Sequence, residues 1–195
     1  MAFIQHSNLS EADDVQLMYP GDRFPCIVGP TLRTTGWRGG SYVQYVTAGD
    51  DFTVEISDGN LAAGFLLFPS ENYTLNQPGS FGVGADAVVG SNANFTSAQP
   101  REGVGGQNVQ TLVERGTRAF FKAFETTALA AGTRSGAATT YTLNEDLKIS
   151  ENGLLCNDSD AALAAAGVTT PQVVGIVSAV PSARNGQRLC LDMKY

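Results

Sequence analysis

Short stretches of alternating apolar and polar residues, separated by turn-forming residues, constrain the fold of this 195-residue chain more than any other feature. In SYVQYVTAGDDFTVEISDGN, residues 41–60, Val54 and Ile56 alternate with Glu55 and Ser57. A period of two places successive side chains on opposite faces of a β-strand. The groups AGDD and SDGN are rich in residues that favour turns. The pattern therefore predicts half-buried strands joined by tight turns.

The carboxyl-terminal half of the chain carries the same kind of pattern. NEDLKISENGLL, residues 144–155, predicts a hairpin that turns at ENG, and VVGIVSAVPSARNGQRLCLDMKY, residues 173–195, predicts a closing hairpin that turns at NG. We expect the core-facing residues of the closing hairpin to be Val174, Ile176 and Val180 on one strand and Leu189, Leu191 and Met193 on the other. Because an unpaired strand edge exposes backbone groups that promote aggregation, the last strand is expected to fill an otherwise open edge.

Two parts of the sequence resemble one another. DDFTVEISDGNL, from residue 50, and NEDLKISENGLL, from residue 144, share an acidic start, an alternating strand, a Ser, an acidic residue and a Gly/Asn pair. GFLLFPS and GIVSAVPS follow them in the same order. The similarity is compatible with a duplicated β-unit and with two hairpins that independently use the same turn residues.

Two further segments have less regular patterns. VQTLVERGTRAFFKAFETTAL, residues 109–129, is compatible with a helix or with strands, and Gly116 and the β-branched Thr residues favour strands. DSDAALAAAG, residues 158–167, predicts a short helix with Asp158 or Ser159 as its N-cap and Gly167 at its carboxyl end.

These patterns predict a mainly β, barrel- or sandwich-like fold with long irregular loops. If the similar segments reflect a duplication, the fold contains two related β-units. Residues 1–25 lack a sustained period and predict an extended N-terminal arm, and residues 26–195 then form one β-rich domain. Within that domain residues 75–107 are rich in Gly, Asn, Ala and Ser, and we expect a long excursion there. Loops of this length inside a domain are commonly functional.

The charge of the chain excludes some classes of partner. The formal net charge is −7, the sequence pI is about 4.6, and the twelve Lys and Arg residues are scattered. A nucleic-acid surface needs clustered basic side chains, so no nucleic-acid partner is expected. We also expect no membrane partner, because no apolar run reaches the length of a membrane-spanning helix. The absence of a secretory signal pattern and the odd number of cysteines, three, predict folding in a cytoplasm with buried, reduced thiols.

No sequence motif predicts catalysis or a bound cofactor. His6 is the only histidine and lies outside every patterned segment, so no Ser-His-acid or Cys-His site is expected. The Gly-rich segments lack the Lys-Ser/Thr ending of a phosphate-binding loop, and NDSD, residues 157–160, lacks the rest of a calcium-binding loop. We therefore expect no enzyme activity, no catalytic residues, no metal site and no cofactor.

The carboxyl-terminal segments TRAFFKAFETTALAAGT, NEDLKISENGLL and VVGIVSAVPSARNGQRLCLDMKY resemble the capsid decoration proteins of tailed bacteriophages, also called cement or head-stabilisation proteins. The resemblance covers residues 117–195 and, more loosely, residues 42–73. It implies an all-β virion protein that is made in the host cytoplasm and binds the capsid exterior as a homo-trimer. It also implies that the major capsid protein is the partner, that contacts between capsomers are stabilised, and that no cofactor is needed.

The candidate contact residues for such a partner are apolar side chains of the arm, of the loop after it and of the excursion: Met18, Tyr19, Phe24, Trp37, Phe81 and Phe95. Two alternatives remain at this point. One is a phage tail, fibre or adaptor component, and the other is a carbohydrate-binding β-domain that would use Trp37 and Tyr42 to stack on a sugar.

Overall fold

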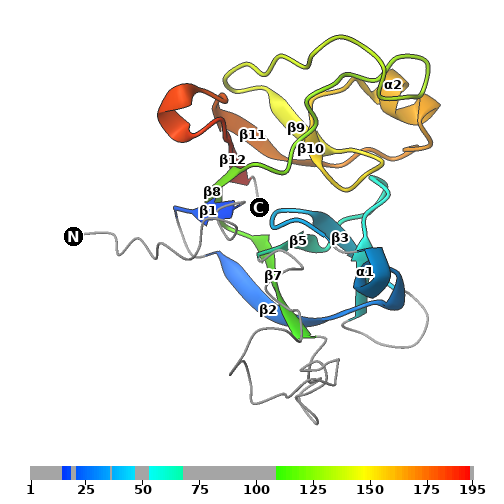
Figure 1. The fold of residues 1–195 in the computed structure, drawn as a ribbon, viewed down its shortest axis with the longest axis vertical. Helices are drawn as coiled ribbons and strands as arrows, with labels where there is room; N and C mark the ends of the chain where they lie inside the picture. The colour runs from blue at the N-terminus through cyan, green and yellow to red at the C-terminus, as the bar shows by residue number, and fades with distance from the viewer. Residues whose placement is uncertain (1–14, 19–20, 36, 47–52, 68–108, 194–195) are drawn as a thin grey trace.

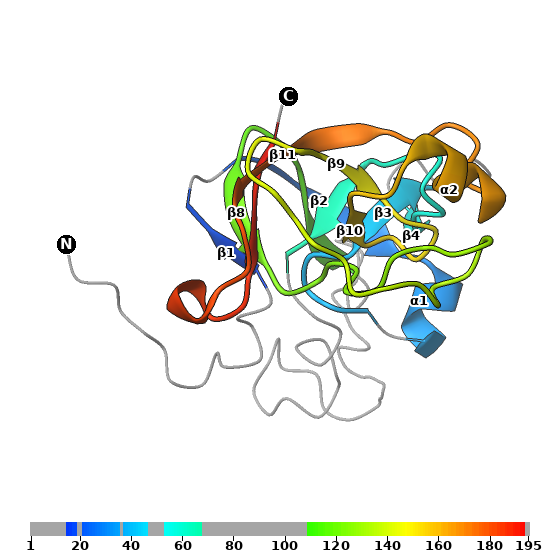
Figure 2. The same cartoon turned by 90° about the horizontal axis from the view of Figure 1, so that it is seen from above.

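Two β-sheets form most of the structure, a computed structural model that describes residues 15–18, 21–35, 37–46, 53–67 and 109–193. Five strands close into a barrel and six strands form an open sheet. Figure 1 shows the barrel strands β2, β3, β5 and β7 below strands β9 to β12 of the open sheet, and in Figures 1 and 2 the two α-helices lie on the side away from β1. The predicted mainly β, barrel- or sandwich-like fold is confirmed.

The barrel has the strand order β2-β4-β3-β5-β7, and β7 returns to pair with β2. All of its neighbouring strands are antiparallel except β2 and β4, which are parallel. The strands are β2 (Asp22–Val28), β3 (Tyr42–Tyr45), β4 (Thr53–Ile56), β5 (Gly64–Leu66) and β7 (Val109–Arg115). Two of these strands, β3 and β4, lie in the segment predicted from its alternation, and β7 confirms the preference for strand at the start of residues 109–129.

A short helix, α1 (Pro30–Thr35), covers one end of the barrel and was not predicted. Its Leu32 is fully buried in the barrel core, together with Cys26, Val28, Val43, Val54, Leu66 and Leu112. The Glu55 carboxylate accepts hydrogen bonds from the backbone N–H groups of Thr31 and Leu32, each at 3.0 Å. These N–H groups have no partner within a helix. A side chain on a neighbouring barrel strand, 23 and 24 residues later in the chain, therefore caps a helix that carries no acidic residue in its first turn.

The open sheet has the order β1-β8-β12-β11-β9-β10, with antiparallel pairing throughout. The strands are β1 (Val15–Leu17), β8 (Arg118–Phe121), β9 (Asp146–Ile149), β10 (Leu155–Cys156), β11 (Val173–Ala179) and β12 (Leu189–Met193). The predicted hairpins β9-β10 and β11-β12 are both present. The expected place of the last strand is wrong, because β12 lies inside the sheet between β8 and β11 and does not fill an edge.

The predicted core face of β11 needs a correction. Gly175 and Val177 are the buried residues of this strand, and Ile176 is not part of the hydrophobic core. Val174 and Val180 pack against the core as expected. The pairing of β11 with β12 shifts register between Val177 and Ala179, and the pairing with β9 shifts between Val173 and Gly175. Such bulges change which face a residue occupies, so simple alternation fails along this strand.

The expected arm of residues 1–25 also needs a correction. Val15–Leu17 form β1, which pairs with β8, and β2 of the barrel begins at Asp22. These residues belong to the two sheets because their backbone groups are paired there. Residues 1–14 and the excursion of residues 75–107 lie outside the described part of the chain.

The predicted helix near residue 160 is α2 (Asp160–Ala165), and Ser159 is its N-cap. Its C-cap is Ala166, and Gly167 follows with a φ of +100°. The N–H of Gly167 donates to the carbonyl of Ala164, and the N–H of Val168 donates to that of Leu163. This is a Schellman motif, in which glycine provides the left-handed residue.

One hydrophobic core joins the barrel to the open sheet. Phe65 of β5 packs edge-on against Phe121 of β8, with ring centroids 4.9 Å apart, and also contacts Tyr42, at 5.7 Å. All three side chains are almost completely buried. The barrel and the open sheet therefore share a core and are not separate hydrophobic units.

The two similar sequence segments lie in different sheets but use the same turn. The hydroxyls of Ser57 and Ser150 each accept a hydrogen bond at 3.1 Å from the backbone N–H two residues later. The strand after the first turn, β5, pairs with β3 and β7, whereas the strand after the second turn, β10, pairs directly with β9. The similarity is thus in turn chemistry, and the strand pairing around the two turns differs.

Candidate functional site

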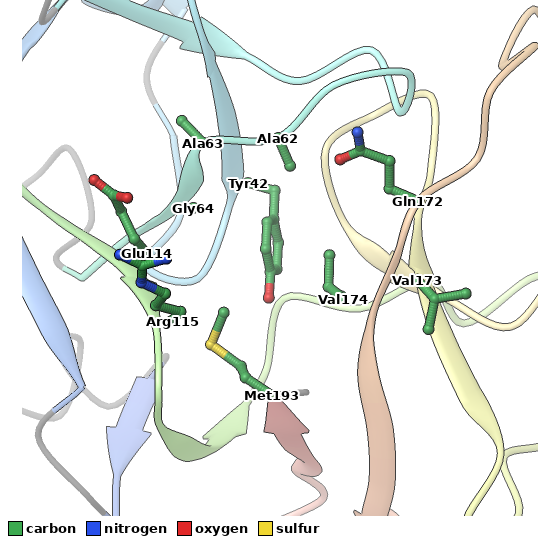
Figure 3. Close-up of a pocket in the computed structure, with 10 residues that line it drawn as sticks. All are labelled: Tyr42, Ala62, Ala63, Gly64, Glu114, Arg115, Gln172, Val173, Val174 and Met193. Atoms are coloured by element: carbon green, nitrogen blue, oxygen red, sulfur yellow. The ribbon is translucent and has the colours of Figure 1, made fainter. Parts of the chain in front are cut away.

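A cavity of about 260 Å³ lies where the barrel meets the open sheet (Figure 3). Residues from five strands and the segments beside them line it: Tyr42, Ala62, Ala63, Gly64, Glu114, Arg115, Gln172, Val173, Val174 and Met193. The starts of β3, β5 and β11 and the ends of β7 and β12 meet here. Polar and apolar groups contribute about equally to the wall.

Tyr42 is the most unusual residue of this cavity. Its side chain is 1% exposed, and its hydroxyl has no hydrogen-bond partner. In Figure 3 the hydroxyl points towards the side chain of Met193 and lies between Arg115 and Val174. Burial raises the pKa of this hydroxyl far above its ordinary value, because the phenolate would lose its hydration. The group therefore stays protonated and can donate a hydrogen bond.

Two side chains of opposite charge, Glu114 and Arg115, stand at one side of the cavity (Figure 3). The Arg115 guanidinium pairs with Asp22 at 3.2 Å in an exposed ion pair. The Tyr45 hydroxyl donates to the Glu114 carboxylate at 3.4 Å. Burial, followed by the negative charge of Glu114, raises the pKa of Tyr45. The two opposite charges leave this side of the cavity with no net charge.

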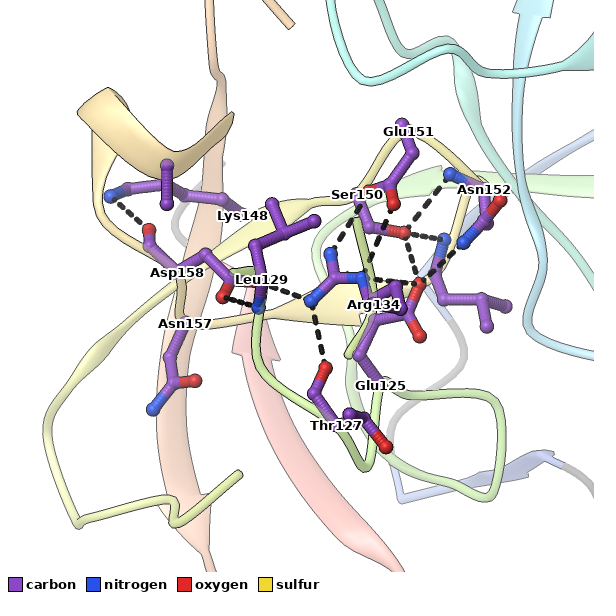
Figure 4. A network of polar contacts seen from close by, with 12 residues as sticks. Glu125, Thr127, Leu129, Arg134, Lys148, Ser150, Glu151, Asn152, Asn157 and Asp158 are labelled. Atoms are coloured by element: carbon purple, nitrogen blue, oxygen red, sulfur yellow. Dashed lines mark hydrogen bonds and ion pairs between the residues drawn. The ribbon is translucent and has the colours of Figure 1, made fainter. Parts of the chain in front are cut away.

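A second polar feature surrounds Arg134, in the loop between β8 and β9 (Figure 4). Its guanidinium pairs with Glu151 at 3.0 Å, with Asp158 at 2.5 Å and with Glu125 at 3.5 Å, and its side chain is only 14% exposed. It also donates to the carbonyl of Thr127. Burial would lower the pKa of Arg134, but the hydrogen bonds that it donates to Glu151 and Asp158, together with the negative charges of Glu125 and Asp158, outweigh burial and raise that pKa above its ordinary value.

Two of the three carboxylates around Arg134, those of Glu125 and Asp158, also accept hydrogen bonds from other groups. The Ser150 hydroxyl and the Asn152 amide donate to Glu125 at 2.7 and 3.1 Å. The Leu129 N–H donates to Asp158, and the Lys148 ammonium donates to the carbonyl of Asp158. This Arg134 cluster links the loop of residues 126–140 to the turn between β9 and β10. Because its groups are satisfied within the protein, we interpret it as structural.

The three cysteines are free and buried, as predicted. Burial raises the pKa values of the Cys26 and Cys156 thiols to about 12, and burial also raises that of Cys190. A thiol is nucleophilic only when it is ionised. The cysteines therefore pack as small apolar side chains.

The structure describes three of the six predicted contact residues, and they differ in exposure. Met18 is 53% exposed and Phe24 is 41% exposed. Trp37 is partly buried and packs against the barrel core. Tyr19, Phe81 and Phe95 lie outside the described part of the chain.

Sequence reasoning missed the cavity. Tyr42 occupies a core position of an alternating strand, and nothing in the local sequence shows that its hydroxyl lacks a partner. Only contact between segments up to 151 residues apart, Tyr42 and Met193, creates the site. The burial of Tyr42 also corrects the sugar-stacking interpretation, because a side chain that is 1% exposed presents no ring face to a glycan.

Neither a metal site nor a membrane-spanning helix is found in the part of the chain that the structure describes. Among the described residues, no three His, Cys, Asp or Glu side chains are grouped so that they could ligate a metal ion. None of the helices in the described segments is long and apolar enough to cross a membrane.

A comparison of the chain with protein-family models, with curated proteins and with solved structures found no match.

Proposed function

We propose that this protein is a phage capsid decoration protein that binds the major capsid protein on the outside of the capsid and stabilises contacts between capsomers. The observation that carries this proposal is the exposure of Met18 and Phe24, two large apolar side chains that the sequence predicted as partner contacts. The resemblance of residues 117–195 to decoration proteins and the acidic, mainly β character of the chain support the same function.

Met18 and Phe24 are exposed although their backbones are held in place. The Met18 N–H donates to the carbonyl of Arg118 at 2.7 Å, next to the end of β1. Phe24 lies in β2, which pairs with β4 and β7, and is opposite Leu112. A backbone that is already fixed loses little further freedom when its side chains bind, so these residues are suited to contact a partner.

Binding to capsids tests the proposal. Particles of the tailed phage that encodes the chain, in unexpanded and expanded form, are sedimented with the purified protein. We expect co-sedimentation with expanded capsids and much weaker binding to unexpanded ones. Equal binding to both forms, or no binding to either, would contradict the proposal.

Variants of the exposed residues make the test specific. The double variant Met18→Ser, Phe24→Ser is expected to weaken capsid binding at least tenfold while the protein keeps a cooperative thermal transition. Leu143→Ser is the matched control, because Leu143 is also exposed, at 61%, but lies in the loop before β9. If Leu143→Ser weakens binding as much as the double variant does, the assigned surface is wrong.

The extent of the predicted arm can be tested separately. A deletion for this purpose should remove residues 1–14 only, because a deletion to residue 25 also removes β1 and part of β2. A decoration protein is further expected to be encoded beside the major capsid gene. A gene position among tail genes would instead support a tail, fibre or adaptor component.

A further inference from the structure

We propose that the loop between β11 and β12, residues 180–188, presents the Arg184 guanidinium to a carboxylate on the surface of the partner protein. The inference rests on the proposed function, because it takes the major capsid protein as that partner. It adds an ionic contact to the apolar contacts of Met18 and Phe24. Three observations carry it: the positive charge of the loop, its strained but ordered backbone, and its place on the β1 side of the molecule.

The loop carries positive charge on an acidic chain. Residues 180–188 contain Arg184 and Arg188 and no Asp or Glu, whereas the whole chain has a formal net charge of −7. Arg184 is exposed, and none of the carboxylates in the described segments forms an ion pair with it. A guanidinium binds a carboxylate through two parallel hydrogen bonds, so the complementary group is an Asp or Glu side chain of the partner. The net negative charge of the chain repels such a group elsewhere, so this contact also orients the protein on its partner.

The loop keeps an unfavourable backbone conformation. Gly186 and Gln187 are both left-handed, with φ angles of +67° and +60°. Glycine adopts this conformation freely, but a residue with a Cβ atom adopts it at a cost in free energy. The 3-10 helix of the loop, η6 (Ala183–Asn185), contains no buried residue, so packing of η6 against the core does not account for this cost. Strained backbone of this kind is frequent at binding sites.

The Asn185 side chain fixes the shape of the loop. Its Oδ1 atom accepts hydrogen bonds from the N–H groups of Ser182, at 2.9 Å, and Arg188, at 3.2 Å. Its Nδ2 group donates to the Val180 carbonyl at 2.9 Å. These bonds hold the backbone of η6 in one conformation before a partner binds, so binding through Arg184 costs little additional backbone order.

The loop lies on the side of the molecule that carries β1. In Figures 1 and 2 η6, drawn in red, lies on the same side as β1 and away from α1 and α2. Leu189, directly after the loop, and Val15 of β1 both pair with Phe121 of β8. The loop therefore joins the sheet two strands, or about 10 Å, from β1. Because the exposed Met18 directly follows β1, one partner surface can contact this residue and the loop together.

Charge reversal tests the contact, with DNA-free expanded capsids of the tailed phage that encodes the chain as the probe. We expect Arg184→Glu to weaken co-sedimentation about tenfold or more and to leave the melting temperature unchanged, because Arg184 is exposed. Arg184→Lys keeps the charge and should retain most of the binding. Raising NaCl from about 0.05 M to about 0.5 M should weaken the unmodified protein more than Arg184→Gln, because salt screens the lost ion pair.

The matched control for charge is the double variant Ala161→Glu, Ala164→Glu. It changes the net charge by the same amount as Arg184→Glu, at two exposed positions of α2 on the side away from β1. We expect this control to bind expanded capsids as tightly as the unmodified protein does.

Asn185→Ala tests whether the order of the loop matters. The variant keeps Arg184 but removes the three hydrogen bonds of the Asn185 side chain. We expect capsid binding about three- to tenfold weaker and faster hydrogen exchange of the Ser182 and Arg188 amides. The melting temperature should change little, because no residue of η6 is buried.

The outcomes separate this contact from the proposed function. If the unmodified protein does not bind expanded capsids, both are wrong. If it binds and Arg184→Glu binds equally well, or if the control on α2 weakens binding as much, capsid binding stands and the Arg184 contact is wrong. Unchanged binding of Asn185→Ala together with faster exchange in the loop would show that the ordered backbone is not used for binding.

Discussion

At the scale of single residues, the guanidinium of Arg134 contacts three carboxylates and is largely shielded from water. Removal of one partner from a buried ion cluster leaves the others uncompensated, which costs far more than the cluster itself contributes. We expect Arg134→Met to lower the free energy of unfolding by about 3–5 kcal/mol, measured by urea denaturation.

The exposed pair of Arg115 and Asp22 provides a control for this substitution. Both side chains are more than half exposed, and water screens their attraction. Arg115→Met should therefore lower the free energy of unfolding by less than about 1 kcal/mol. Similar losses for the two variants would mean that the Arg134 cluster is not held as the structure shows.

The buried thiols predict a dependence of stability on alkaline pH. In the folded protein the pKa values of Cys26 and Cys156 are about 12, whereas the ordinary thiol value is about 9. Above that ordinary value the unfolded chain releases protons that the folded protein retains, which favours unfolding. The free energy of unfolding should fall by about 1.4 kcal/mol per thiol for each pH unit above this value.

The thiol contribution can be isolated in the double variant Cys26→Ala, Cys156→Ala. Urea denaturation between about pH 8 and about pH 10 should show a flatter dependence on pH in this variant than in the unmodified protein. The range stops where tyrosines of the unfolded chain begin to ionise. An equal slope in both proteins would assign the alkaline sensitivity to other groups.

At the scale of elements, the start of α1 depends on Glu55 and on the absence of a side chain at Gly29. A Cβ atom at Gly29 would lie 2.3 Å from the Glu55 carboxylate oxygen that accepts from Thr31. Gly29→Ala should therefore displace the carboxylate and remove the cap. We expect Gly29→Ala and Glu55→Ala each to lower the free energy of unfolding by about 1–2 kcal/mol.

A double-mutant cycle tests this coupling. Since both substitutions remove the same cap, Gly29→Ala should cost much less when Glu55 is already alanine. Chemical denaturation of the two single variants and the double variant gives the coupling energy. Additive losses would show that Gly29 has a different role from leaving space for the carboxylate.

Some helices and strands could be predicted from the local sequence, and others could not because they depend on neighbouring elements. β4 and β9 lie in segments with a local period of two, and Ser159 and Gly167 carry the cap chemistry of α2. In contrast, α1 contains no acidic residue in its first turn and takes its cap from Glu55 in another element. The bulges in β11 depend on neighbouring strands, and the alternation that predicted Ile176 as a core residue could not reveal them.

At the scale of the whole molecule, β12 connects the halves of the open sheet. It pairs with β8 on one side and β11 on the other, and its Leu189 and Leu191 are fully buried. Deletion of residues 189–195 should abolish the cooperative thermal transition, because β8 and β11 each lose one of their two neighbouring strands and the core loses these side chains. Circular dichroism and differential scanning calorimetry measure this outcome.

The matched deletion removes residues 1–14, which precede β1. Since it removes none of the described strands, we expect it to retain a cooperative transition. If the deletion of residues 189–195 also retains one, then β12 does not have the central role that its pairing indicates.

The sequence by itself determined the β class, most strand positions, the turns and the burial of the cysteines, because these follow from local periodicity and residue chemistry. Only the tertiary structure decided the closure of the barrel, the central place of β12, the Arg134 cluster and the cavity beside Tyr42. Each of these depends on contacts between residues far apart in the chain, such as Tyr42 with Met193 or Arg134 with Asp158. Local sequence patterns cannot predict such contacts, because the free energy that stabilises these contacts arises only when the sheets pack together.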